Sequence, residues 1–90
     1  MILPLADKRV VVVGLSKSGR AAAQLAVKLG AQVVGLDLSL DVEPIEEVTF
    51  ELGPHKPQTL LNADLIVLSP GIPANIAPVQ AAEAAGVKVI

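Results

Sequence analysis

The sequence predicts an α/β fold, a Rossmann-like open parallel sheet of five strands with helices on both of its faces. Short apolar runs alternate with helical segments along the chain, a pattern typical of parallel α/β sheets. The first apolar run leads into a glycine-bounded turn and an alanine-rich helix. This strand, the helix and the next strand span about 30 residues, the length of a right-handed βαβ unit with parallel strands.

The composition limits the classes of function. The 90 residues are expected to form one domain, residues 1–90, or a piece of a larger chain. Phe50 is the only aromatic residue and the net charge is −2, so no nucleic-acid partner is expected. There is no cysteine, hence no disulfide and no thiolate metal site. No apolar run approaches the about 18 residues of a membrane span, and residues 1–7 do not resemble a signal peptide. We therefore expect a cytoplasmic protein without a membrane partner.

The first half of the chain predicts two strands joined by a helix. Arg9–Val13 ends in four valines and is expected to be a buried strand. Ser18 is placed to cap the helix that follows, and Gly30 is placed to end it. Residues 32–36 form the second strand, which ends at Asp37. The helix is expected to bury one apolar stripe at helical spacing, made of Ala22, Leu25, Ala26 and Leu29.

The second half predicts three more strands and two helices. Residues 38–47 are acidic and irregular. Val48–Leu52 is expected to be a short third strand and Leu65–Leu68 a buried fourth strand, with a short helix between them over Pro57–Leu61. The last helix is expected to begin at Pro78 and to stop at Gly86, and residues 87–90 begin a fifth strand.

The turn at residues 14–19, Gly-Leu-Ser-Lys-Ser-Gly, predicts an anion site. The first backbone N–H groups of a helix lack internal partners, and the positive end of the helix dipole points at the turn. Lys17 and Arg20 lie near this end, where exposed cations are unfavourable by about 0.3–1 kcal/mol each. A phosphate between the two side chains would explain the pair; two solvated surface charges are the alternative.

The turn differs from three better-known motifs. A dinucleotide-binding turn has a second glycine where this chain has Ser16. A Walker A loop ends in Gly-Lys-Ser/Thr, whereas Gly19 is followed by Arg20 and Ala21. A nucleophile elbow would need glycine at Ser18. The turn is therefore typical of a phosphate site that is neither an ATPase loop nor a hydrolase, and NAD binding is weakened as an interpretation but stays open.

Two further segments follow predicted strands, at the edge where α/β sheets bind ligands. Asp37 stands at the distance from the turn at which dinucleotide-binding sheets place a ribose-binding carboxylate, although a solvated strand-end residue is an equal alternative. Residues 69–71, Ser-Pro-Gly, form a turn that can expose N–H groups to the same ligand. His55 and the acidic run are expected to be solvated. No nucleophile, general base or metal cluster can be assembled, so the chain is expected to bind rather than to catalyse.

Three stretches resemble the N-terminal domain of the Mur ligases, most closely that of the members that add D-glutamate. They are Val-Val-Val-Gly-Leu-Ser-Lys-Ser-Gly at 11–19, Asp37, and Ala-Asp-Leu-Ile-Val-Leu-Ser-Pro-Gly-Ile-Pro at 63–73. The resemblance runs over essentially all of the chain, and the third stretch is its most specific part. It implies a Rossmann-like domain that binds the UDP part of UDP-N-acetylmuramoyl-L-alanine in the synthesis of peptidoglycan precursors.

The resemblance also implies that the substrates of the complete ligase are bound by different domains. ATP with Mg would be held by a central domain and D-glutamate by a C-terminal domain, both absent here, so this domain would hold no cofactor and would be non-catalytic alone. The complete ligase would phosphorylate the substrate carboxylate, and the amine of D-glutamate would displace the phosphate. Carried onto this chain, the implied substrate-binding residues are Leu15, Ser16, Lys17, Ser18 and Gly19 around the diphosphate, Asp37, Leu38 and Ser39 at the uracil, and Ser69, Pro70, Gly71 and Ile72 beside the nucleotide.

Two positions depart from the family pattern. Glycine is usual where this chain has Ser16, and a basic residue is frequent where it has Ser39. The first departure affects how closely the backbone approaches the diphosphate, and the second removes one contact to uracil or ribose. Two other interpretations stay open: an NAD(P)-binding or ligand-sensing Rossmann module, and a truncated or designed scaffold without a ligand.

Overall fold

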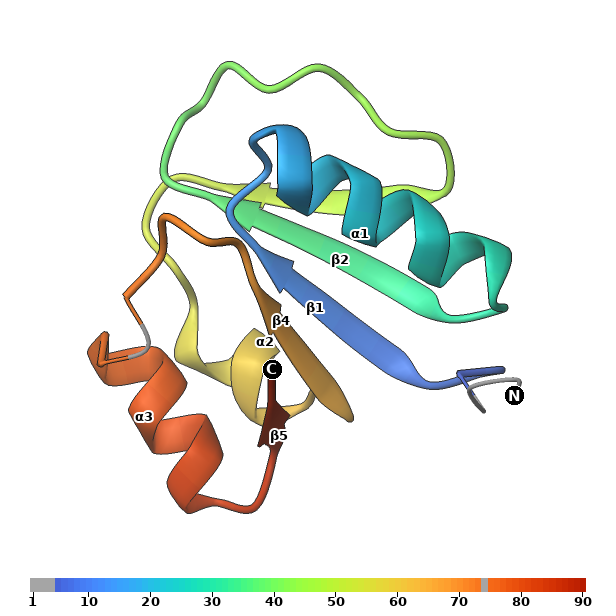
Figure 1. Cartoon of the computed structure of the whole chain (residues 1–90). Coiled ribbons are helices and arrows are strands. Elements are labelled where there is room, and N and C mark those ends of the chain that lie inside the picture. The colour runs from blue at the N-terminus through green and yellow to red at the C-terminus, as the bar shows by residue number, and fades with distance from the viewer. Residues whose placement is uncertain (1–4, 74) are drawn as a thin grey trace.

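The computed structural model describes residues 5–73 and 75–90, so most of the segment compared with a signal peptide lies outside it. Figure 1 shows strands and helices in the predicted order. The short helix has the predicted bounds, because Pro57 supplies a preformed first helical residue. The elements are β1 (Arg9–Val13), α1 (Lys17–Lys28), β2 (Gln32–Asp37), β3 (Val48–Leu52), α2 (Pro57–Leu61), β4 (Leu65–Leu68), α3 (Ala77–Ala84) and β5 (Lys88–Val89).

All five strands are parallel and lie in the order β3-β2-β1-β4-β5. β1 is central and pairs with β2 through Val13 and Leu36 and with β4 through Val13 and Leu68. From β1 the chain first adds strands on one side and then returns to add β4 and β5 on the other. This confirms the Rossmann-like sheet, and the carboxyl ends of β1, β2 and β4 meet at the edge where ligands bind in such folds.

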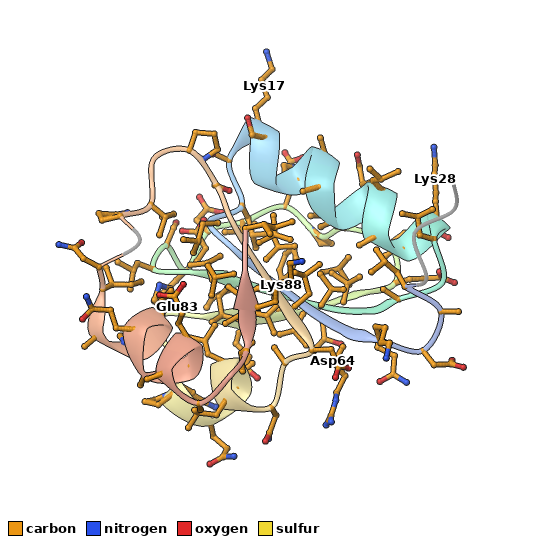
Figure 2. The ribbon with its side chains drawn as sticks, turned by 60° about the horizontal axis from the view of Figure 1, so that its bottom comes forward. Lys17, Lys28, Asp64, Glu83 and Lys88 are labelled. Atoms are coloured by element: carbon orange, nitrogen blue, oxygen red, sulfur yellow. The ribbon has the colours of Figure 1, made fainter. Side chains whose placement is uncertain are left out.

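The helices cover both faces of the sheet, as predicted (Figures 1 and 2). Because side chains alternate along a strand, Val10 and Val12 face α1 while Val11 and Val13 face the other side. One core packs the first pair against Ala23 and Ala26 of α1, together with Ile45 of the segment between β2 and β3. The second core packs the other pair against the remaining helices, including Leu60 of α2 with Val79 and Ala82 of α3.

Helix α1 corrects two predictions. It begins at Lys17, so the residue at its N-cap is Ser16 rather than Ser18, and that serine makes no side-chain capping bond. Its buried residues are Gly19, Ala23 and Ala26, whereas Leu25 is 56% exposed. Gly19 lies so close to the turn before it that it sets the rotation of the helix, and the small alanines one and two turns later then face the sheet. The prediction that Leu25 belongs to the stripe was wrong.

Smaller differences concern bounds and one histidine. β2 extends through Asp37, α3 begins at Ala77, and β5 covers only Lys88–Val89. His55, expected to be solvated, is half-buried, and its Nδ1 atom is enclosed without a hydrogen-bond partner among the described residues. None of the helices described is long and apolar enough to cross a membrane.

Candidate functional site

The turn after β1 places the start of α1 beside the end of the strand. Gly14 adopts a φ of +88°, which favours glycine, and its N–H donates to the Leu36 carbonyl at 2.7 Å. Because the Ser16 hydroxyl caps no N–H, the first turn of α1 presents its backbone donors without a side-chain partner from the N-cap. The Lys17 side chain extends away from the molecule at this point (Figure 2). A helix start of this kind can accept an anion, and its use for that purpose stays a prediction.

The turn after β4 is hydrogen-bonded to the turn after β1 and packs closely against it. Ser69 is only 4% exposed, and its hydroxyl donates to the Gly14 carbonyl at 2.5 Å while its N–H donates to Val13 at 3.0 Å. A Cβ on Gly19 would overlap that same carbonyl oxygen and the Ser69 hydroxyl. A Cβ on Gly14 would lie 2.9 Å from Cγ1 of Ile72. The two turns therefore form one closely packed junction.

Asp37 joins the same turn to the segment after β2. Its Oδ2 accepts the Leu15 N–H at 2.8 Å, and its Oδ1 accepts the Ser39 N–H at 2.9 Å. The Ser39 hydroxyl in turn accepts the Asp41 N–H at 3.1 Å. Both carboxylate oxygens thus hold protein backbone, which modifies the expectation that Asp37 is free to serve a ligand alone. The free lone pairs of each oxygen can still accept a further donor.

These contacts surround an open cleft of about 320 Å³ at the carboxyl edge of the sheet. It brings four of the predicted site residues together, namely Leu15, Ser16, Asp37 and Ser39, and it is completed by Arg20, Asp41, Val42 and Glu43. The following predicted residues are not part of its lining: the exposed Lys17, Ser18 and Leu38, the buried Gly19, and Ser69, Pro70, Gly71 and Ile72, which follow β4.

Arg20, expected from the sequence beside a phosphate or in solvent, bonds to backbone carbonyls of a distant segment. Its Nη1 donates to the Glu43 carbonyl at 2.8 Å and its Nη2 to the Pro44 carbonyl at 3.4 Å. Two of the five guanidinium donors are therefore directed at the segment between β2 and β3. That segment has no periodic pattern, so the sequence offered no signal that it returns across α1 (Figure 1).

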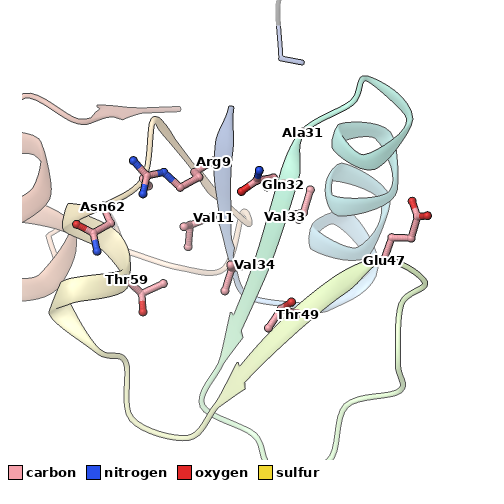
Figure 3. Close-up of a pocket in the computed structure, with 11 residues that line it drawn as sticks. Arg9, Val11, Ala31, Gln32, Val33, Val34, Glu47, Thr49, Thr59 and Asn62 are labelled. Carbon is pink, nitrogen blue, oxygen red and sulfur yellow. The ribbon is translucent and has the colours of Figure 1, made fainter. Parts of the chain in front are cut away.

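A larger hollow of about 590 Å³ lies elsewhere on the molecule (Figure 3). Its floor includes Val11 and Val34, and its sides include Thr59 of α2, Asn62 just after that helix, and Thr49 of β3. This hollow occupies the sheet face opposite α1, toward the amino ends of β1 and β2, away from the edge where α/β sheets bind ligands. Size alone therefore does not make it the candidate site.

Replacing Ser69 with alanine is expected to lower the free energy of unfolding by about 1–3 kcal/mol, because it removes the hydroxyl that donates a hydrogen bond to the buried Gly14 carbonyl. Equilibrium urea unfolding measures the change. Ser39→Ala is the matched control, since the Ser39 hydroxyl is exposed and bonds only within its own segment. Equal losses in the two variants would contradict a special role for the buried bond.

Comparison with known proteins decides the family. Residues 8–90 match the model of the family described as "Mur ligase MurD-like, N-terminal domain". The chain belongs to this family. A protein of Bdellovibrio bacteriovorus named UDP-N-acetylmuramoylalanine--D-glutamate ligase is 42% identical over 94% of this chain and 20% of its own length. A Myxococcus xanthus protein of the same name is 40% identical over 99% of this chain and 21% of its own length. The MurD-like domain thus spans about a fifth of each of these relatives.

Solved structures place the MurD-like domain among Rossmann folds. A D-2-hydroxyisocaproate dehydrogenase superposes with a TM-score of 0.69 at 24% identity, over 92% of this chain and 25% of that one. A D-lactate dehydrogenase of Lactobacillus jensenii, solved with NAD+, gives a TM-score of 0.57 at 27% identity, over 69% of this chain and 18% of that one. These likenesses support the Rossmann-like fold.

Proposed function

We propose that this MurD-like domain binds the UDP part of UDP-N-acetylmuramoyl-L-alanine, within a ligase that adds D-glutamate in peptidoglycan precursor synthesis. One observation carries the proposal: a single turn with an uncapped helix start adjoins a cleft of about 320 Å³ at the carboxyl edge of the sheet. That arrangement suits one diphosphate with one nucleoside beside it. Membership of the MurD-like family supports this choice of substrate, since relatives are named UDP-N-acetylmuramoylalanine--D-glutamate ligase.

The residues divide between the two halves of the ligand. The diphosphate would lie at the start of α1, where Lys17 and Ser18 are exposed and the helix dipole favours negative charge. Uracil and ribose would enter the cleft beside Asp37 and Ser39, with the exposed Leu38 at the rim. The turn from Ser69 to Ile72 would flank the nucleotide from the side of β4.

The chemistry would belong to the longer ligase. There ATP, with Mg, would transfer its γ-phosphoryl group to an oxygen of the substrate carboxylate and leave ADP. The amine of D-glutamate would then attack the acyl carbon, form the amide and release phosphate. The domain described here would hold and orient the nucleotide end of the substrate, and it would be non-catalytic alone.

Calorimetric titration with UDP, UDP-N-acetylmuramic acid and NAD tests the proposal. We expect either uridine ligand to bind more tightly than NAD, because the cleft of about 320 Å³ beside the turn suits one nucleoside, whereas NAD carries a second nucleoside on its diphosphate. Adenosine diphosphate is the matched control for the base. Tighter binding of NAD than of both uridine ligands would instead support an NAD-binding Rossmann module.

A further inference from the structure

We propose that Arg20 is a positioning residue: it fastens residues 38–47 across α1 and thereby preforms the cleft for the nucleoside. This inference rests on the proposed function, because it assigns that cleft to uridine. It departs from the expectation that Arg20 meets a phosphate directly. Arg20 would affect nucleoside binding by holding residues 38–47 in place, without contact between its guanidinium and the diphosphate.

The contacts of Arg20 span two elements that are distant in sequence. Arg20 lies in the first turn of α1, and its two guanidinium nitrogens donate to consecutive carbonyls, those of Glu43 and Pro44, at 2.8 and 3.4 Å. Both carbonyls belong to the long irregular connection between β2 and β3, which runs beside α1 (Figure 1). A planar fork with several donors is suited to holding two neighbouring acceptors at once.

The fastened part of the connection is also a wall of the cleft. Asp41, Val42 and Glu43 line it opposite Leu15 and Ser16, and Arg20 lines it too. On one side of this wall, Asp37 holds the N–H of Ser39. On the other side, Ile45 is 6% exposed and packs in the core beneath α1. Arg20 therefore holds the backbone of the segment between Ser39 and Ile45, whose two ends are fixed by other contacts.

Fixing this stretch before the ligand arrives would raise affinity by preorganisation. An unfastened wall would have to be ordered during binding, and that loss of freedom would oppose association. The segment also carries Asp41, Glu43, Glu46 and Glu47, whose mutual repulsion favours a more open path. The guanidinium that bonds to the Glu43 and Pro44 carbonyls brings a positive charge to this acidic segment while it holds the backbone.

The test compares Arg20→Ala, Arg20→Lys and Lys17→Ala by two measurements. The first is the rate at which a glutamate-specific protease cleaves the intact chain after Glu43, Glu46 or Glu47, all of which are exposed. Cleavage after Glu83 of α3, also exposed, reports on unrelated opening. The second is the calorimetric affinity for uridine and for UDP, whose ratio isolates the contribution of the diphosphate.

For Arg20→Ala we expect cleavage in the segment to accelerate about tenfold, with cleavage at Glu83 unchanged. The dissociation constants of uridine and UDP should both rise about tenfold, so that their ratio stays constant. Arg20→Lys should restore part of each effect, since one ammonium can reach one carbonyl. Lys17→Ala should leave cleavage unchanged and weaken UDP alone, in a salt-dependent manner.

Other outcomes would overturn the inference. Faster cleavage of the segment with unchanged uridine affinity would make the contact structural only. A loss confined to UDP in Arg20→Ala would make Arg20 a direct phosphate ligand, as Lys17 is proposed to be. If the unaltered protein binds no uridine ligand, the proposed function fails, while unchanged cleavage in Arg20→Ala would separately show that Arg20 does not fasten the segment.

Discussion

Replacing Gly19 with alanine is expected to lower the free energy of unfolding by about 3 kcal/mol or more. The new Cβ would overlap the Gly14 carbonyl oxygen and the Ser69 hydroxyl. The first of these atoms is backbone, held by a turn that also bonds to Leu36 and Ser69, so it cannot swing aside as a flexible side chain could. Urea unfolding followed by far-ultraviolet circular dichroism measures the loss.

Gly71→Ala is the matched control for Gly19→Ala. No atom lies within 4 Å of a Cβ built on Gly71, and its φ is not in the left-handed region. We expect a change within about 0.5 kcal/mol. Should Gly19→Ala prove equally mild, α1 must be able to withdraw from β1, and the closely packed junction would not be the constraint described above.

Replacing Asp37 with alanine is expected to weaken UDP binding at least about tenfold and to lower the free energy of unfolding by about 1–2 kcal/mol. The carboxylate accepts hydrogen bonds from the N–H groups of Leu15 and Ser39, which lie in the two segments that border the cleft. Bonds to a charged group contribute about 1.5–3 kcal/mol when well formed, and partial exposure reduces that figure. Calorimetry with UDP and thermal unfolding on the same variant give both quantities.

Asp64 offers a control with the same kind of bond at the opposite edge of the sheet. Its Oδ2 accepts the Arg9 N–H at 2.8 Å, the same distance as the bond from Leu15 to Asp37. Asp64→Ala should therefore reduce stability without changing the affinity for UDP. Equal affinities of the Asp37 and Asp64 variants would remove Asp37 from the candidate site and leave it a structural bridge.

The sequence predicted the sheet well because its strands are nearly pure apolar runs with clear ends. The valines of Arg9–Val13 leave no polar alternation, which indicates a strand buried on both faces, and Gly30 and Pro57 mark helix ends by their backbone preferences. The turn at residues 14–19 and Asp37 were identified for the same reason: each directly follows such a run. Their use in binding UDP stays a prediction.

The parts that sequence reasoning missed depend on contacts between distant segments. Leu25 fits an apolar periodicity, but the rotation of α1 is set by the close approach of Gly19 to the end of β1, which leaves Leu25 mostly exposed. Arg20 fits a phosphate site by position, but its partners belong to an irregular segment whose path no local pattern specifies. Only the folded arrangement distinguishes a charge that meets a ligand from one that holds a loop.

The junction between the turns after β1 and β4 has a consequence for how the domain is made. The Gly14 carbonyl meets a hydroxyl that follows it by 55 residues, and the N–H of Arg9 meets a carboxylate at the same separation. Synthesis proceeds at about 5–20 residues per second, so β1, α1 and β2 leave the ribosome well before β4, the strand that pairs with the other edge of β1. The nascent chain can form its βαβ unit early, but the glycine turn gains its buried support only after Ser69 emerges. The turn proposed to hold the diphosphate is thus completed late in translation, although most of its residues are among the first to be made.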